Sequence, residues 1–459
     1  MSITYDHIIV GTGQATGTLL GRLIPTGESI AVIEGGRVGG SCVNYGCTPT
    51  KTLVASARAA QFARRGEFYG VRVDEPAIDY ARVRERMNEI RMGSSDGLTR
   101  WMEETENVTL IRGWAAFTGP KQPQVGDRRV SGRRIYINTG TRPFAPPIPG
   151  LAEAPWLDSA RLLELETLPQ HLVVIGGGYI GVEFAQVYRR FGAQVTLIQR
   201  GAQLMPREDE DVAGAIQEFL EEEGVRVLVG TNTARVASDD EGLVRVTVER
   251  GGETEEIVGS HLLVATGRRP NSERLALAAA GIETNKRGYI VVDDLCRTKV
   301  EGVYAVGDVN GQGAFTHTSV NDAEIVLDHI FGGARRISSR IPIYALFTDP
   351  PLGRVGLSER AALAAGHKLL KATRPMRRIS RAKEMGETRG FAKLLVDADT
   401  DQLLGAAILG PGGDEIINMV AVIMHAELPR RRFREIVLVH PTVSELIPWI
   451  LDDLKPVAS

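Results

Sequence analysis

Two cysteines near the start of the chain have a spacing at which they could form and break a disulfide. Cys42 and Cys47 are separated by four residues in the stretch GGSCVNYGCTPTK, residues 39–51. Thr48 and Pro49 predict that a helix begins just after the second cysteine, with Thr48 as its N-cap. Cys47 would then lie at the positive end of a helix dipole, which favours the reactive thiolate. The pattern favours a redox pair; two buried inert cysteines, or half of a metal site, are the alternatives.

The composition restricts the kinds of partner that the protein is expected to bind and the cellular compartment in which we expect it. A length of 459 residues predicts about three domains. A formal net charge of −3 argues against a nucleic-acid or anionic-membrane partner. No apolar run is long enough to span a bilayer, and the first residues lack the basic segment of a signal peptide. The one other cysteine, Cys296, completes no set of metal ligands, and so few cysteines are typical of the reducing cytoplasm, where we expect this protein.

The residues before the cysteines have the pattern of a dinucleotide-binding strand–helix–strand unit. An apolar strand at residues 8–10 leads into Gly11-x-Gly13 and a helical segment, and a second strand ends on Glu34, 23 residues after the first glycine (34 − 11). The two glycines let the backbone approach a pyrophosphate at the helix N-terminus, and the acid can accept a ribose hydroxyl. Thr16 stands where the third glycine is expected, so the packing of this helix on its strand must differ.

The same unit occurs a second time. A strand beginning at Leu172 leads into a complete G-x-G-x-x-G loop, formed by Gly176, Gly178 and Gly181. The position that matches Glu34 holds Gln199 and is followed by Arg200. Because an acid there would repel a 2′-phosphate and an arginine would bind it, this loop favours NADPH over NADH.

Further segments predict strands that complete these units and a third region of different character. Two strands end on Thr-Gly, at Thr139-Gly140 and at residues 266–267, and each would close one nucleotide fold. Residues 225–248 alternate in the manner of an antiparallel meander. A buried strand ends on Gly307-Asp308, and from about residue 341 we expect an α+β domain with helices near residues 416–426 and 444–454.

Several motifs occur in an order that together resembles one family. They are GSC and GCTPTK at residues 40–51, GGGYIGVE at 176–183, ATGR at 265–268, AVGD at 305–308 and HPTVSE at 440–445. Over essentially the whole chain the sequence is similar to the pyridine nucleotide-disulfide oxidoreductases, such as glutathione reductase, dihydrolipoyl dehydrogenase and mercuric reductase. The resemblance implies an α/β fold class: two Rossmann-like dinucleotide-binding domains, for FAD and NAD(P)H, and a C-terminal α+β dimerisation domain.

The resemblance also implies domain bounds and a homodimer. The FAD domain would comprise residues 1–146 and a return segment, 270–337. The NAD(P)H domain would comprise residues 147–269, and the dimerisation domain residues 338–459. In the family, each chain's histidine completes the active site of the other chain.

Roles for individual residues follow from the same resemblance. Cys47 matches the thiol that contacts the flavin, and Cys42 matches the thiol that attacks the substrate. Lys51 matches the lysine beside flavin N5, and Glu183 matches the acid that holds that lysine in place.

His440 and Glu445 match a general acid–base pair, in which the carboxylate orients the imidazole. Tyr179 matches the aromatic residue that covers the flavin until nicotinamide displaces it, and Asp308 matches the acid that holds the ribityl chain. The cofactor-binding residues predicted by the loops and the resemblance together are Gly11, Gly13, Glu34, Gly40, Ser41, Lys51, Thr139, Gly140, Asp308, Gly176, Gly178, Tyr179, Gly181, Arg200 and Gly267.

The leading hypothesis is an NADPH-dependent FAD enzyme that reduces a disulfide substrate through Cys42 and Cys47. One alternative is a reductase of a metal ion, such as copper(II) or mercury(II), or of a quinone, by the same relay. Another is an NAD-linked dihydrolipoyl dehydrogenase subunit of a multienzyme complex. The tail at residues 451–459 lacks the cysteine pair of mercuric reductases, and Gln199-Arg200 argues against NAD.

Overall fold

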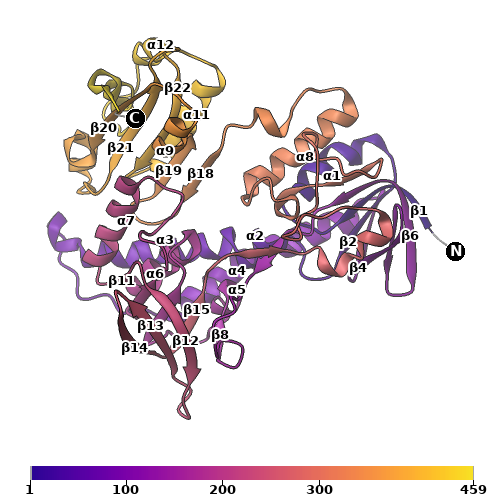
Figure 1. Ribbon diagram of the computed structural model, residues 1–459, viewed down its shortest axis with the longest axis horizontal. Helices are drawn as coiled ribbons and strands as arrows, with labels where there is room; N and C mark the ends of the chain where they lie inside the picture. The colour runs from indigo at the N-terminus through magenta and orange to yellow at the C-terminus, as the bar shows by residue number, and fades with distance from the viewer. Residues whose placement is uncertain (1–2, 458–459) are drawn as a thin grey trace.

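The computed structural model describes residues 3–457 and has three lobes, each built around a sheet (Figure 1). In Figure 1 the N-terminal lobe lies on the right, the second lobe at the lower left and the C-terminal lobe at the upper left. Two helices of the first lobe, α3 (Cys47–Arg64) and α4 (Tyr80–Glu104), extend across to the second. The predicted fold class, two Rossmann-like units and an α+β domain, is confirmed.

The first lobe contains a seven-stranded sheet whose central part is parallel. Its strands are β1 (Ile3–Val10), β2 (Ile30–Glu34), β3 (Val108–Arg112), β4 (Ala115–Gly119), β5 (Gln122–Val125), β6 (Arg128–Ile137) and β17 (Val303–Ala305), in the order β3-β2-β1-β6-β5-β4 with β17 beside β6. Helices α1 (Ala15–Leu23) and α8 (Thr316–Phe331) lie side by side in this lobe. Because β17 pairs with β6 in parallel, the chain returns to this sheet after the second lobe.

The second lobe repeats the parallel design. Its five parallel strands are β8 (Trp156–Leu157), β9 (His171–Ile175), β10 (Gln194–Ile198), β11 (Arg226–Leu228) and β15 (His261–Val264), in the order β11-β10-β9-β15-β8. Its helices are α5 (Ser159–Leu162), α6 (Tyr179–Phe191) and α7 (Glu210–Glu222). A two-stranded ribbon of β7 (Thr141–Pro143) and β16 (Arg268–Pro270) joins the segments that cross between the first two lobes.

The predicted meander at residues 225–248 is partly wrong. The meander is formed by β12 (Asn232–Ser238), β13 (Val244–Arg250) and β14 (Glu253–Gly259). Residues 226–228 instead form β11, which pairs in parallel with β10. Periodicity of apolar residues does not separate a short edge strand of a buried parallel sheet from the meander that follows it.

The C-terminal lobe is a six-stranded antiparallel sheet with helices. Its elements are β18 (Ile343–Leu346), β19 (Leu352–Gly356), α9 (Glu359–Ala364), β20 (Leu369–Pro375), α10 (Ser380–Glu384), β21 (Phe391–Asp397), β22 (Leu403–Leu409), α11 (Gly413–His425), α12 (Arg430–Arg434) and β23 (Lys455–Pro456). The helix expected near residues 416–426 is α11. The stretch 444–454 forms two short 3-10 helices rather than an α-helix, and the second begins at Pro448, which lacks the N–H that would continue an α-helix.

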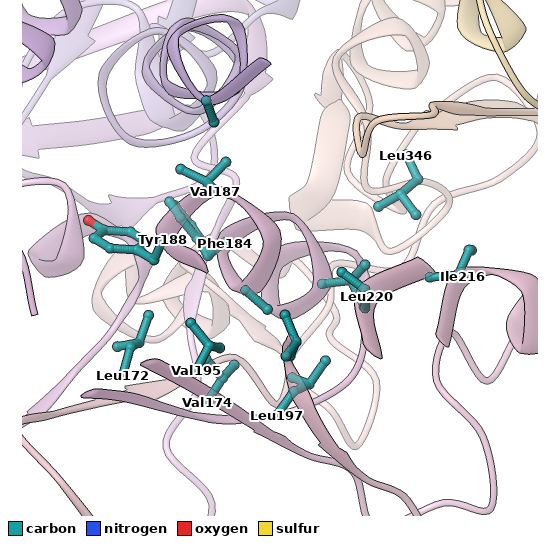
Figure 2. Packing of buried hydrophobic residues seen from close by; sticks show 14 of the residues in the cluster. Leu172, Val174, Phe184, Val187, Tyr188, Val195, Leu197, Ile216, Leu220 and Leu346 are labelled. Atoms are coloured by element: carbon teal, nitrogen blue, oxygen red, sulfur yellow. The ribbon is translucent and has the colours of Figure 1, made fainter. Parts of the chain in front are cut away.

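One hydrophobic cluster spans the second and C-terminal lobes, which also have cores of their own. Figure 2 shows Leu172, Phe184 and Leu220 packed in the second lobe, with Leu346 of β18 approaching from the C-terminal lobe. A buried lysine adds a polar connection: Lys393 of β21 is 0% exposed, and its Nζ donates to Asp209 Oδ2 at 2.8 Å and to Asp211 Oδ1 at 2.7 Å.

Candidate active site

The two predicted redox cysteines lie on consecutive helices that meet at a glycine. Cys42 belongs to α2 (Gly40–Tyr45), and Cys47 is the first residue of α3. Between them Gly46 has φ −132° and ψ −116°, and a Cβ there would lie 3.0 Å from the Ser41 carbonyl oxygen. A side chain at position 46 would therefore push the two turns apart. Both cysteines are free in this structure.

The predicted N-cap of α3 is wrong by two positions. The helix begins at Cys47 with Gly46 as its N-cap, and Thr48 and Pro49 lie within its first turn. Thr48 matches the usual cap pattern, but the sharp backbone turn at Gly46 already starts the helix. Cys47 is still at the helix N-terminus, as the electrostatic argument requires.

The surroundings make the two sulfurs chemically unequal. A hydrogen bond from the Cys42 thiol, aided by the Thr316 hydroxyl and the charge of Lys51, lowers the pKa of Cys47 to about 6 against the opposing effect of burial. The Thr316 Oγ1 atom lies 3.5 Å from Cys47 Sγ. The same thiol–thiol hydrogen bond, followed by burial, raises the pKa of Cys42. At neutral pH Cys47 is the thiolate and Cys42 keeps its proton.

Lys51 and Glu183 meet across the junction of the first two lobes. Lys51 is four residues after Cys47 on α3, and its Nζ donates to Glu183 Oε2 at 2.8 Å and Oε1 at 3.0 Å. The Glu183 side chain is 7% exposed and also accepts from the backbone N–H of Phe347 at 2.9 Å. The ammonium lies 4.5 Å from the centre of the Phe347 ring. The acid thus holds the lysine in place, as the resemblance implies.

A cavity of about 1060 Å³ extends from the first glycine loop to these side chains. Thirteen predicted residues line it: Gly11, Gly13, Glu34, Gly40, Ser41, Cys42, Cys47, Lys51, Thr139, Gly140, Tyr179, Glu183 and Asp308. Its size and length suit an extended dinucleotide.

Details of the wall fit FAD. A Cβ on Gly11 would lie 2.3 Å from the Asn138 carbonyl oxygen, and one on Gly40 would lie 2.8 Å from Gly13 Cα, so the backbone is bare where a pyrophosphate would approach. The Thr139 hydroxyl is buried without a hydrogen-bond partner in the described residues. The carboxylate of Asp308 accepts from the Thr141 hydroxyl at 2.8 Å, and burial raises its pKa. These groups would contact a bound ligand.

Glu34 is held at the end of β2 by its own glycine loop. Its Oε2 accepts from the Thr12 backbone N–H at 2.9 Å and from the Thr12 hydroxyl at 2.5 Å, and its Oε1 accepts from the Gly36 N–H at 2.7 Å. The carboxylate is therefore fixed at the cavity wall, where it can accept a ribose hydroxyl.

The second glycine loop lies outside this cavity. The predicted residues on or beside this loop are Gly176, Gly178, Gly181, Arg200 and Gly267. A Cβ on Gly176 would lie 2.5 Å from the Ala265 carbonyl oxygen, and Gly178 is the N-cap of α6. Gln199 Oε1 accepts from the Gly177 N–H at 3.0 Å. Arg200 is exposed and forms no ion pair within residues 3–457. The loop leaves this guanidinium available to an anion.

His440 and Glu445 form the predicted pair, but not beside the cysteines of their own chain. His440 Nδ1 lies 2.9 Å from Glu445 Oε1, and the histidine side chain is 76% exposed. Neither residue lines the cavity. Val437 and Val439 nearby are 96% and 76% exposed. Within one chain this pair therefore lies outside the cavity that the sulfurs line.

Three residues near the reacting groups were missed by the sequence reasoning. Thr316 contacts Cys47. Phe347 contacts both members of the Lys51–Glu183 pair. Glu208 contacts Tyr179. A threonine that directly precedes a helical pattern is a weak signal for the first, and no local pattern marks the other two.

Among the described residues, no helix has the length and apolar character needed to cross a membrane. The described part of the chain also contains no cluster of three or more His, Cys, Asp or Glu side chains that could hold a metal ion.

The chain is similar in sequence to known proteins over most of its length. Residues 5–323 match the family described as pyridine nucleotide-disulphide oxidoreductase, and residues 343–451 match the dimerisation domain of that family. The probable pyridine nucleotide-disulfide oxidoreductase RclA of Escherichia coli is 36% identical over 451 residues, which cover 96% of this chain and 97% of that protein. A mercuric reductase of Lysinibacillus sphaericus is 33% identical over 90% of this chain and 76% of that protein.

A solved structure shares the whole arrangement. The Cu(II) complex of the HOCl-induced flavoprotein disulfide reductase RclA from Escherichia coli superposes with a TM-score of 0.90 and 35% sequence identity, covering 98% of this chain and 99% of that chain.

Proposed function

Because this chain belongs to the pyridine nucleotide-disulphide oxidoreductases, we propose that it is an NADPH-dependent enzyme that reduces a disulfide substrate through Cys42 and Cys47. Members of this family are flavoproteins that bind FAD and NAD(P). The observation that carries the proposal is the inequality of the two sulfurs. Cys47 has a lowered pKa beside the Lys51–Glu183 pair, and Cys42 has a raised one.

The residues of the cavity wall would hold FAD along the first lobe. Bound FAD would supply the passage of two electrons from a nicotinamide hydride to the sulfur pair. Lys51 places a positive charge beside Cys47, and Glu183 keeps it there. Thr316 donates toward the Cys47 sulfur and stabilises its anionic form.

The reduced pair would then reduce the substrate by exchange. The Cys42 thiolate bonds to one sulfur of the substrate disulfide, the substrate S–S bond breaks, and the other substrate sulfur leaves and takes up a proton. The Cys47 thiolate attacks the Cys42 sulfur, which closes the Cys42–Cys47 disulfide and releases the second substrate thiolate, to be protonated in turn.

The raised pKa of Cys42 means that a base must remove its proton before it can attack. His440, oriented by Glu445, is suited to this step but lies outside the cavity of its own chain. We therefore propose a homodimer in which each chain's His440 serves the other chain's Cys42. The match of residues 343–451 to a dimerisation domain supports this arrangement.

The nucleotide preference is part of the proposal. Gln199 stands in place of an acid, and Arg200 is free to bind a 2′-phosphate, which supports NADPH over NADH. The domain bounds given above, with residues 1–146 and 270–337 binding FAD and residues 147–269 binding NADPH, belong to the same proposal. The low cysteine content supports a cytoplasmic location.

Copper(II) is the second candidate acceptor. The RclA structure that superposes on this chain is a Cu(II) complex. Two adjacent free thiols, Cys42 and Cys47, are ligands that copper favours and can also reduce it.

The deciding experiment measures NADPH oxidation by the purified holoprotein against a panel of low-molecular-weight disulfides and Cu(II), for wild type and His440→Ala. We expect a disulfide to be turned over, and His440→Ala to abolish that turnover while largely sparing Cu(II) reduction. Turnover of Cu(II) alone, unaffected by His440→Ala, would transfer the proposal to the second candidate.

The dimer is tested by mixing defective subunits. Cys42→Ser and His440→Ala chains, each nearly inactive, would form mixed dimers in which one site carries both defects and the other carries neither. Random assortment should restore roughly a quarter of wild-type disulfide turnover. If differently tagged chains pair and no activity returns, His440 does not act across the interface.

A further inference from the structure

The ring of Tyr179 stands at the junction between the second glycine loop and the cavity. It is the first residue of α6, directly after the loop, and it lines the cavity together with Lys51 and Glu183. A nicotinamide that extends from the second loop into the cavity must therefore pass this side chain. What holds Tyr179 in place decides how easily that passage opens.

Two aromatic residues from other elements contact the Tyr179 ring edge-on. The Phe315 centroid lies 5.9 Å away at 86°, and the Tyr344 centroid lies 5.6 Å away at 84°. Phe315 and Tyr344 are themselves stacked, 5.4 Å apart and 7° from parallel. Edge-to-face pairs of this kind are favourable, so the ring has a defined resting position.

The hydroxyl of Tyr179 donates a hydrogen bond to a buried carboxylate. Glu208 Oε1 accepts from the Tyr179 hydroxyl at 3.4 Å and from the Tyr344 hydroxyl at 2.6 Å. The Glu208 side chain is 0% exposed, and Arg354 Nε lies 3.5 Å from its other oxygen. Two tyrosines therefore share one carboxylate oxygen, and the shorter bond belongs to Tyr344.

We propose that Glu208 is a positioning residue that holds Tyr179 across the passage to the nicotinamide, and that Tyr344 weakens this hold by competing for the same oxygen. The inference rests on the proposed function, since it concerns access of NADPH to the flavin. Opening must break the Tyr179–Glu208 bond as well as the two edge-to-face contacts, so the strength of that bond contributes to the fraction of molecules that can accept the nucleotide.

Two substitutions that each remove one hydroxyl should act in opposite directions. Tyr179→Phe removes the bond and favours opening, so the apparent Kd for NADPH in anaerobic stopped-flow reduction of the flavin should fall about threefold. Tyr344→Phe keeps the aromatic stack but leaves Oε1 to Tyr179 alone, so the apparent Kd should rise about twofold or more. Glu208→Gln should resemble Tyr179→Phe, and the double variant Tyr179→Phe/Glu208→Gln should show no further fall.

Tyr80→Phe is the matched control, because the Tyr80 hydroxyl bonds to that of Tyr188 in the buried core, outside the cavity lining. It should leave the apparent Kd unchanged. A second readout needs no nucleotide: iodide quenching of flavin fluorescence should increase in Tyr179→Phe and Glu208→Gln and decrease in Tyr344→Phe.

The outcomes separate this inference from the proposed function. Shifts of the same sign in Tyr179→Phe and Tyr344→Phe, or wild-type values in both readouts, would overturn the role of Glu208. If neither nucleotide reduces the flavin of the wild type, the proposed function fails, and the quenching series alone decides on Glu208. If the flavin is reduced but no disulfide is, only the substrate proposal fails.

Discussion

In the first nucleotide fold the helix after the glycine loop carries Thr16 where the second fold carries Gly181. A Cβ on Gly181 would lie 1.9 Å from the Gly176 carbonyl oxygen. Thr16 instead donates its hydroxyl to the equivalent carbonyl, that of Gly11, at 2.9 Å, and accepts from Asn138 Nδ2 at 3.0 Å. A hydrogen bond in one fold thus replaces the direct contact of helix and loop in the other.

The two folds differ again just after their second strands. Beyond Glu34 the first fold continues into the helices that carry Cys42 and Cys47. Beyond Gln199 the second fold continues into residues 200–209, which include Arg200 and Glu208. The same position in a repeated unit therefore leads to the proposed redox pair in one copy and to the proposed recognition and gating of the nucleotide in the other.

Replacing Gly181 by the threonine of the first fold should have the largest effect. Gly181→Thr places a side chain where even a Cβ cannot fit, so we expect a loss of more than about 4 kcal/mol or failure of the second lobe to fold. Urea unfolding followed by circular dichroism measures this. Gly181→Ala is the milder variant, and a melting temperature within about 2 °C of wild type would contradict the close packing.

Arg200→Glu should alter the nucleotide preference of the second fold, where Gln199 and Arg200 stand in place of the acid Glu34 of the first fold. Loss of a charge-assisted contact and added repulsion should lower kcat/KM for NADPH about 100-fold and change that for NADH little. Arg250→Glu, which alters an exposed arginine at the end of β13, is the matched control. A wild-type enzyme that already prefers NADH would refute the role of Arg200.

The ionised cysteine should be Cys47 of the first fold, and its ionisation should depend on pH. With a pKa lowered to about 6, Cys47 is ionised above that pH and protonated below it. Its alkylation rate by iodoacetamide in the reduced protein, followed by mass spectrometry, should therefore fall about tenfold from pH 7 to pH 5. Cys42→Ala removes the principal hydrogen bond and should shift this transition to higher pH; an unchanged transition would argue against that bond as the cause.

Substitution of Thr16 should have the smallest effect of these changes. Thr16→Gly removes its bonds to Gly11 and Asn138 and should cost about 1–2 kcal/mol in the free energy of unfolding. Thr16→Ser keeps the hydroxyl and should remain closer to wild type in the same urea titration. Equal losses in both would show that the methyl group, not the hydroxyl, supports this helix.

Local patterns were sufficient for the parts of the site that are local in the chain. The two glycine loops, the strand ends and the position of Cys47 at a helix N-terminus follow from spacing and residue type. The exact start of α3 did not follow, because the backbone angles of Gly46 cannot be read from its neighbours.

Contacts between distant residues needed either the resemblance or the structure. Lys51 and Glu183 are 132 positions apart, and only the similarity to a family suggested the pair. Tyr179 lies on α6, Glu208 in the loop before α7 and Tyr344 on β18 of the C-terminal lobe, and no periodicity connects them. Side chains that meet across lobes are set by the tertiary arrangement, which local propensity does not encode.

The buried Lys393 limits how the molecule can move during turnover. Because the fully buried Lys393 ammonium binds Asp209 and Asp211, separating the second lobe from the C-terminal lobe would break its hydrogen bonds to both carboxylates. A hinge between these two lobes is therefore costly, and we expect them to move as one body during turnover. Travel of one of these lobes against the other should then add nothing to the dependence of turnover on solvent viscosity.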